Sequence, residues 1–157
     1  MKPRSRGFSL IELLAVMAVL GVLAAAALPM AELVRQREQE RELKQALWEL
    51  RAAVDAYKRA YDEGTIARSG PPSGYPPSLK ALMEGQAASN NRGPSRVYFL
   101  RRVPRDPFAP AELAAEDTWG LRGFDSPPDK PQPGSDVYDV YSKSGRIGLN
   151  GVPLRQW

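Results

Sequence analysis

Glu12 is the one charged residue in an apolar run from Phe8 to Ala31. As a helix, a run of this length covers roughly 36 Å, which is enough to cross the bilayer's hydrocarbon core of about 30 Å. A carboxylate at the middle of a bilayer costs on the order of 2.5–3.5 kcal/mol, and less near the interface. Because so costly a group is rarely kept without a function, we expect Glu12 to have a specific partner.

The chain offers little other reactive chemistry. Its 157 residues include no Cys and no His, so thiolate chemistry, disulfides and the commonest general base and metal ligand are all missing. The sequence has no nucleophile elbow, no phosphate-binding glycine loop and no metal-ligand spacing. No pair among its 18 acidic residues is singled out by position. We therefore predict that the protein is not an enzyme.

Basic residues before the apolar run set its expected orientation. Lys2, Arg4 and Arg6 precede it, and the positive-inside rule then leaves the N-terminus in the cytoplasm and all later residues outside. The net charge of +4 is too small to indicate binding to nucleic acid or acidic lipid by itself. Two simple alternatives remain at this point: a secretory signal peptide cleaved within residues 24–27, and a plain signal anchor.

The segment "GFSLIELLAVMAVLGVLAAAALP" (residues 7–29) resembles the N-terminus of type IV pilins and of type II secretion pseudopilins. The resemblance rests on Gly7 before Phe8, on Glu12 as fifth residue of the mature chain, and on Pro29 at that family's helix kink. It implies that a prepilin peptidase cleaves after Gly7 on the cytoplasmic side and methylates Phe8. It also implies a partner for Glu12, the Phe8 amine of a neighbouring subunit, because opposite charges attract strongly at low dielectric.

Residues 32–63 continue the helix beyond the membrane. One apolar stripe recurs at spacings of three and four, which predicts that this face is buried; it comprises Leu43, Leu47, Leu50, Val54, Tyr57 and Tyr61. Residues 35–42 have no stripe, so we expect a solvated stalk there. Gly64 ends a helix of about 55 residues, kinked or weakened at Pro29. We expect its second half to pack on a sheet, and a short coiled-coil seam is the alternative.

The second half of the chain reads as a small head. Ser78 and Gly85 delimit a short helix, "LKALMEG", and strands are expected within 96–104, 117–124 and 136–145. The stretches 64–78 and 86–95 read as loops, and a Pro-rich loop, 125–135, joins the last two strands. The predicted fold class is α+β: a long N-terminal helix, transmembrane in its first half and amphipathic in its second, on a small antiparallel sheet.

Five fragments of the head resemble the major, G-type pseudopilin of type II secretion, in that family's order. They are "YPPSLKALMEG" (75–85), "YFLRRVPRDPF" (98–108), "WGL" (119–121), "VYDVYSKSG" (137–145) and the terminal Trp157. The resemblance implies a type IV pilin-like fold and a structural subunit of a periplasmic pseudopilus. It implies four segments: a basic leader (1–7), a transmembrane and polymerisation helix (8–31), its amphipathic continuation (32–63) and a periplasmic globular head (64–157). The implied partners are copies of the chain itself, other pseudopilins, prepilin peptidase, the inner-membrane assembly platform and the lipid bilayer.

One loop departs from the G-type pattern. G-type pseudopilins bind calcium through acidic side chains after the last strand, whereas "SKSGRIGLNG" (142–151) has none. Ser144 and Asn150 would make only a weak calcium site, and Asp136 and Asp139 should lie on a strand. We therefore expect no cofactor, keep calcium as the alternative, and consider that a cationic side chain, Lys143 or Arg146, takes the place of the ion.

Two clusters admit a second interpretation. Basic and aromatic residues alternate in the first strand region, as on single-stranded nucleic-acid platforms; they are Arg92, Arg96, Tyr98, Phe99, Arg101, Arg102 and Arg105. A minor type IV pilin or competence pilin that contacts DNA is thus the alternative function, although we favour an ordinary strand. Trp48, Trp119 and Trp157 would form either a binding patch or, as we expect, core filling and a docked C-terminus.

Overall fold

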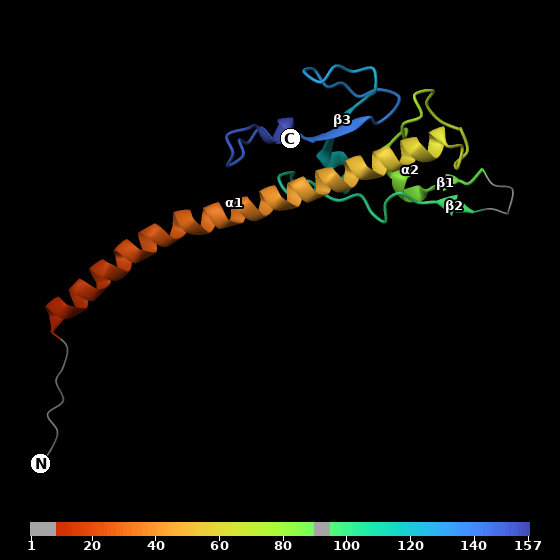
Figure 1. The fold of residues 1–157 in the computed structure, drawn as a ribbon. Helices are drawn as coiled ribbons and strands as arrows, with labels where there is room; N and C mark the ends of the chain where they lie inside the picture. Colours follow the sequence, from red (N-terminus) through yellow and green to blue (C-terminus); the bar gives the residue numbers. More distant parts are fainter. Residues whose placement is uncertain (1–8, 90–94) are drawn as a thin grey trace, which may run out of the picture. The chain divides into compact units, whose positions relative to one another are not determined.

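The computed structural model describes residues 9–89 and 95–157, and for residues 26–29 it describes only the backbone. One helix, α1 (Leu10–Asp62, 53 residues), occupies the first third of the chain (Figure 1). This confirms the long helix expected from the sequence. Packing divides the chain into two units, one up to Glu38 and one from Gln39 to Trp157. The second half of α1 therefore belongs to the same unit as the head.

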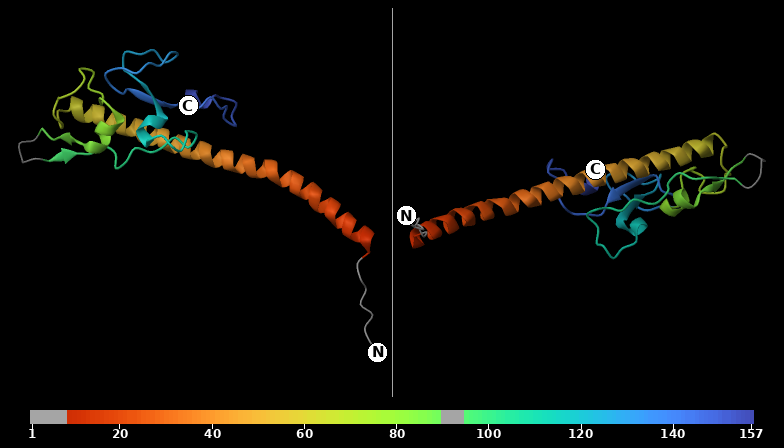
Figure 2. Two further views of the ribbon diagram at one scale, coloured as in Figure 1. Left: turned by 180° about the vertical axis from the view of Figure 1, so that it is seen from behind. Right: turned by 90° about the horizontal axis from the view of Figure 1, so that it is seen from below.

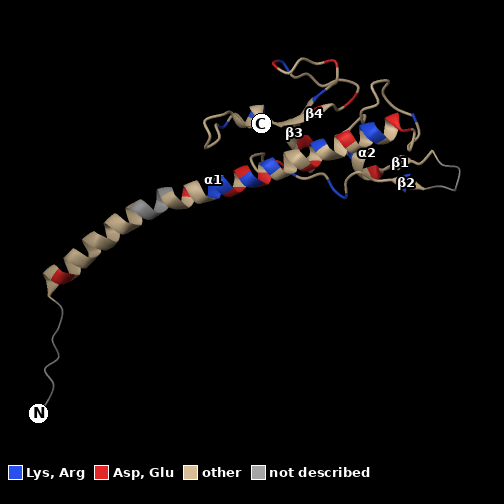
Figure 3. Ribbon diagram, in the orientation of Figure 1, with Lys and Arg blue, Asp and Glu red and all other residues tan. Residues whose placement is uncertain are grey.

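The first unit is the apolar part of α1. Its side chains are exposed from Leu10 to Ala25, and this helix is long and apolar enough to cross a membrane. Glu12 is the one acidic residue in these first turns, and mixed charges begin only further along the helix (Figure 3). The helix continues through Pro29 without a break, so the kink expected there stays a prediction.

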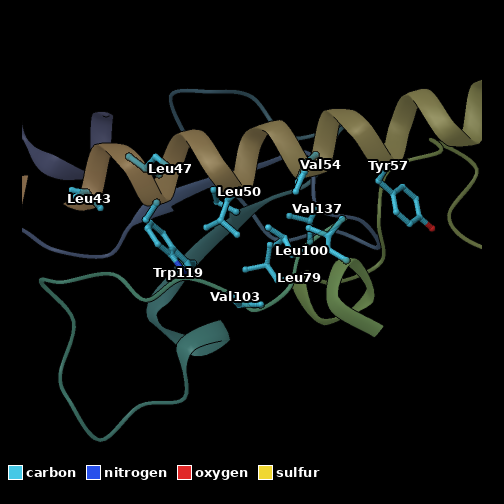
Figure 4. Packing of buried hydrophobic residues seen from close by; sticks show 14 of the residues in the cluster. Leu43, Leu47, Leu50, Val54, Tyr57, Leu79, Leu100, Val103, Trp119 and Val137 are labelled. Carbon is cyan, nitrogen blue, oxygen red and sulfur yellow. The ribbon is translucent and has the colours of Figure 1, made fainter. Parts of the chain in front are cut away.

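The second unit is held together by the predicted stripe. Leu43, Leu47, Leu50, Val54 and Tyr57 of α1 are all buried, each no more than 3% exposed (Figure 4). They meet side chains from the shorter elements and loops, which lie along the second half of α1 (Figures 1 and 2); these are Ile66, Leu79, Leu82, Leu100, Val103, Trp119, Val137, Val140 and Leu154. Each buried aliphatic side chain of this kind contributes about 1.5–3 kcal/mol. Helix periodicity therefore places the hydrophobic core correctly.

The strands form two small antiparallel sheets. β1 (Gln86–Ala87) pairs with β2 (Arg96–Val97), and β3 (Trp119–Arg122) pairs with β4 (Asp139–Ser142). The α+β class with antiparallel pairing is confirmed, whereas a single sheet and strands as long as 96–104 and 136–145 were wrong expectations. The segment 86–95 is also not purely a loop, because it begins with β1.

β2 is short because its continuation bonds elsewhere. The backbone N–H groups of Phe99 and Leu100 both donate to the Leu82 carbonyl, at 3.0 Å each. Leu82 lies on α2 (Leu79–Glu84), which Ser78 caps by accepting a hydrogen bond from the Ala81 N–H at 3.2 Å. Because these N–H groups bond to α2, they cannot also bond to a neighbouring strand, and β2 ends before them. The predicted caps of α2 are thus confirmed.

A long loop joins β3 to β4 and is closed at its base by two glycines. A Cβ built on Gly123 would lie 3.0 Å from the backbone of Gly134, and the Gly123 N–H donates to the Gln132 carbonyl at 2.9 Å. Two short 3₁₀ helices complete the head, η1 (Ala115–Thr118) before β3 and η2 (Leu154–Gln156) at the end of the chain. The Pro-rich connection between the last two strands is as expected.

Candidate functional site

Glu12 lies in the first turn of α1. Its backbone N–H donates to the carbonyl and the hydroxyl of Ser9, at 3.1 and 3.3 Å, so Ser9 caps the helix. The Glu12 side chain is exposed, and it makes no ion pair with any residue that the structure describes. A carboxylate beside a helix N-terminus is also favoured by the helix dipole. The geometry leaves this carboxylate open to a group from another molecule.

The apolar first half of α1 also presents small residues. Gly21 and Ala25 lie four residues apart on one exposed face, and a Cβ built on Gly21 would meet nothing within 4 Å. Such faces let helices approach closely in lipid. Gly7 and Phe8 lie outside the described residues, as does the side chain of Pro29, so the structure tests none of their expected roles.

An arginine clamp joins four parts of the head. Arg51 of α1 donates from Nε to an oxygen of Asp139 at 2.9 Å, and Arg122 of β3 donates to the other oxygen at 3.2 Å. The Arg51 guanidinium also donates to the main-chain oxygens of Val140, at 3.2 Å, and Trp157, at 2.8 Å. One side chain therefore fixes the helix, β4 and the C-terminal residue together.

A buried carboxylate anchors the loop after β4. Glu40 is only 7% exposed, and its Oε1 accepts the Leu149 N–H at 2.7 Å. The expected solvated stalk, 35–42, is thus wrong at Glu40, because the C-terminal loop covers this turn of α1. One signal was available in the sequence: Glu40 lies three residues before Leu43, on the extension of the buried stripe.

The same loop is held at three further points. Ser142 donates to the Asp106 carboxylate at 2.6 Å, and Asp106 is 1% exposed. Lys143 Nζ donates to the Asp117 carbonyl at 2.9 Å. The Arg146 guanidinium lies 5.1 Å from the centroid of the Phe108 ring. Both cationic side chains considered from the sequence therefore tie the loop to the segment 106–117.

The N-terminus of the chain matches a known family model. The model for the prokaryotic N-terminal methylation motif matches residues 2–28, which include Gly7, Phe8 and Glu12. The type II secretion system core protein G of Klebsiella pneumoniae is 28% identical over 106 residues, which are 67% of this chain and 70% of that protein. The chain therefore carries the type IV pilin-like methylation motif and is similar to a type II secretion pseudopilin over most of its length. No solved structure matches it.

The residues of the loop 142–151 lack the acidic ligands of the calcium site that the G-type resemblance implies. Ser144 Oγ accepts the Arg146 N–H at 3.2 Å, and Asn150 Oδ1 accepts the Val152 N–H at 3.0 Å, so both weak candidates bond to the loop's own backbone. Within residues 9–89 and 95–157, no three Asp, Glu, His or Cys side chains are grouped to hold a metal. Calcium prefers several hard oxygen ligands, carboxylates among them, and this loop contains no acidic side chain, so the absence of a calcium site stays a prediction.

The two nearby aspartates are also engaged. Asp139 opens β4 and belongs to the arginine clamp. Asp136 precedes β4, contrary to the expectation that it lies on a strand, and accepts hydrogen bonds from the Ser73 hydroxyl and, at 2.8 Å, the Phe124 N–H. Neither carboxylate is directed to the loop at 142–151 by these contacts.

The arginine-rich segment, residues 92–105, makes mostly structural contacts. Arg96 donates to the carbonyls of Glu84 and Gly85, at 2.8 and 3.3 Å, and Arg105 donates to those of Pro110 and Leu113. Phe99 packs against the core, whereas Tyr98, Arg101 and Arg102 are exposed, and Arg92 lies outside the described residues. These contacts favour the structural interpretation, and nucleic-acid binding stays an untested alternative.

The three tryptophans have different roles. Trp119 is 1% exposed in the core, and its Nε1 donates to the Pro104 carbonyl at 2.8 Å. Trp157 packs against the core, with Lys44 Nζ 4.6 Å from its ring centroid. Trp48 is 74% exposed, so the expectation of core filling is wrong for this residue. It lies next to Leu47 in sequence, which turns it by about 100° from the buried stripe.

Two tyrosines have raised pKa values. Burial, and secondarily the nearby Tyr61, raises the pKa of the Tyr57 phenol. Burial, and then Tyr138, also raises the pKa of Tyr75, while Lys58 opposes this shift. Both phenols therefore stay neutral at physiological pH and take no part in charge pairing.

Proposed function

We propose that this protein is a pseudopilin, a structural subunit of a type II secretion machine. Prepilin peptidase cleaves it after Gly7 and methylates Phe8, and the mature chain polymerises into a periplasmic filament. The observation that carries the proposal is the methylation motif over residues 2–28 on an apolar helix whose first turn holds an exposed Glu12. Among the residues that the structure describes we find no catalytic constellation, and we propose a mechanical role for the protein, not an enzymatic one.

The chemistry of the N-terminus explains why processing would control assembly. Cleavage at Gly7 creates the Phe8 amine, and only a mature subunit then offers both an amine and, four residues on, the Glu12 carboxylate. A subunit in the wrong axial register leaves one charge buried and unpaired, which is strongly unfavourable. The exposed small residues Gly21 and Ala25 permit close helix packing in the same filament.

The proposed location follows from the charges around α1. Three basic residues before the apolar run support a cytoplasmic N-terminus by the positive-inside rule, and hence a periplasmic head on a single-pass inner-membrane protein. The partners in this location are further copies, other pseudopilins, the peptidase and the inner-membrane assembly platform. A separate cytoplasmic ATPase would supply the energy for adding subunits.

Mass spectrometry of the chain from membranes tests this proposal. A mature N-terminus at methylated Phe8, together with membrane oligomers in a crosslinking assay, supports it. A mature N-terminus near Leu28 would establish a secretory signal peptide instead. An uncleaved chain without oligomers would indicate a plain signal anchor.

A minor type IV pilin or competence pilin that contacts DNA is the second candidate. It is favoured by the exposed Arg101 and Arg102 beside the exposed Tyr98, since cations with a free aromatic ring suit single-stranded nucleic acid. A gel-shift assay with the detergent-solubilised chain separates the two. Binding that weakens steeply with salt supports this candidate, because phosphate contacts release counterions.

A further inference from the structure

An exposed tryptophan marks a groove on the outer face of α1. Trp48 is 74% exposed and borders a groove of about 380 Å³. Ala52 and Asp55 of α1 line it, together with Asn150 and Trp157 of the C-terminal segment. We call this the Trp48 groove. A large apolar ring held in water at such a hollow is typical of an interaction surface.

The helix face around the groove is basic. Positions three, four or seven residues from Trp48, and one turn further on, lie on the same face of α1. This face holds four cations and one carboxylate, namely Arg41, Lys44, Arg51, Arg59 and Asp55. The acidic Glu42 and Glu49 are turned away by about 100° or more. Arg51 is held by Asp139 and Lys44 lies over the Trp157 ring, and the positive charges of this face still outnumber its one carboxylate.

A second surface on the head has the opposite character. The segment "PAELAAED" (110–117), here called the acidic loop, contains three acidic residues and no basic one. Glu112, Glu116 and Asp117 are exposed, and Leu113 between them is 40% exposed. Figure 2 (right) shows the chain before η1 projecting from the head, away from the C-terminal residue.

The acidic loop is held in place by cations from the body of the head. Arg105 donates to the carbonyls of Pro110 and Leu113, and Lys143 donates to that of Asp117 at 2.9 Å. These bonds use main-chain oxygens, so the acidic side chains stay available. A loop already ordered loses little conformational entropy on binding.

We propose that the acidic loop of one copy of this chain docks in the Trp48 groove of a second copy. Leu113 meets the Trp48 ring, and Glu112 and Glu116 meet the basic face around it. Because the two surfaces differ and lie on separate parts of one chain, the contact is head-to-tail, and repetition along a helical axis builds the open filament of the proposed function. The inference rests on the proposed function and assigns a contact between heads to the same filament.

Cysteine crosslinking tests the contact directly, because the chain has no Cys of its own. Ala52→Cys places a thiol in the groove and Ala114→Cys places one beside Leu113, both at exposed positions. When the two full-length variants are co-expressed and mildly oxidised, we expect a mixed disulfide dimer. Ala52→Cys with Ser135→Cys, at an exposed position on another loop, is the matched control and should yield about tenfold less dimer.

Charge reversal tests the specificity. Glu112→Lys/Glu116→Lys in the Ala114→Cys copy should lower the dimer yield about tenfold, which corresponds to about 1.4 kcal/mol. Arg41→Glu/Arg59→Glu in the Ala52→Cys copy should restore it. An unchanged yield after reversal, or a yield equal to that of the Ser135→Cys control, would overturn the contact. So would a disulfide to a different protein in place of a second copy.

A parallel measurement separates this inference from the proposed function. Val16→Cys and Leu20→Cys place thiols on the exposed apolar face of α1. Their disulfide crosslinks report oligomers formed through the membrane segment. Membrane oligomers without the Ala52–Ala114 disulfide would overturn the contact between heads and leave the proposed function standing. If no oligomer of either kind forms, both proposals fail.

Discussion

Arg51 and Asp139 are 88 residues apart in the chain, yet they meet at 2.9 Å between Nε and Oδ1. The same guanidinium holds the main-chain oxygens of Val140 and Trp157, so the pair joins α1 to β4 and to the C-terminal residue. Arg51 thus fastens the head to α1 alongside the apolar core and the hydrogen bond from Leu149 to Glu40.

Arg51→Ala should destabilise the head by about 1–3 kcal/mol, the range for charge-assisted hydrogen bonds, with the lower end favoured because Arg51 is 40% exposed. Arg51→Lys should recover only part of this, since an ammonium group cannot reach three acceptors with the guanidinium's planar geometry. Thermal unfolding of the detergent-solubilised chain measures the change. Lys80→Ala, which removes an exposed pair with Glu84, is the control and should have almost no effect.

Gly7→Val should block processing, because a branched side chain at the cleavage site obstructs the peptidase that we propose. The variant should accumulate as a full-length precursor in the membrane, whereas the parent chain begins at methylated Phe8. Intact-mass measurement distinguishes the two forms. Normal cleavage of the valine variant would argue against a peptidase that requires Gly7.

Glu12→Ala should permit insertion and cleavage but prevent assembly. Removing the carboxylate lowers the cost of insertion, while the Phe8 amine of each neighbour would be buried without a partner. Glu12→Asp keeps the charge with a shorter reach and should assemble in part. Crosslinking at equal expression gives the readout, and normal filaments from the alanine variant would show that apolar and small-residue packing sets the register alone.

Calcium should not stabilise the head, because Ser144 and Asn150 already bond to the loop's backbone and no acidic side chain lies in the loop. The melting temperature in millimolar calcium should equal that in a chelator. A ligand at 100 times its Kd adds about 2.7 kcal/mol, which would raise the melting temperature by several degrees. A rise of that size would mean that backbone and hydroxyl oxygens suffice for a site.

Glu40→Ala should loosen the C-terminal loop, since the Leu149 N–H would lose its acceptor, at a cost of about 1–3 kcal/mol. Glu40→Gln keeps an acceptor oxygen and should cost less. Hydrogen exchange at the Leu149 amide reports this local loosening. The exchange rate should be higher in the alanine variant. Glu42→Ala, at an exposed position two residues further along α1 and on another face, should leave this amide protected.

The long helix and its core were predictable because they depend on local periodicity. The spacing from Leu43 to Tyr57 specifies a helix face whatever it packs against, and Ser78 and Gly85 carry local signals for the ends of α2. Glu12 was also visible, because a lone charge in an apolar run is conspicuous without any tertiary information.

The remaining features depend on contacts between distant residues. β2 stops where Phe99 and Leu100 bond to Leu82, and no property of the strand's own residues announces this. Glu40 looked like part of a solvated stalk because its burial is caused by a loop more than a hundred residues later. Arg51 was one of many charged positions on α1 until β4 brought Asp139 to it.

The glycine neck of the β3–β4 loop has an evolutionary and practical consequence. Gly123 and Gly134 approach too closely for a side chain at Gly123, so the base of the loop is fixed by backbone alone. Changes in the loop beyond this base, such as in the exposed residues 127–130, should therefore have little effect on β3 and β4. Substitutions and insertions should therefore accumulate at this tip during evolution. An engineered epitope should also be tolerated there, because lengthening a closed loop costs little entropy.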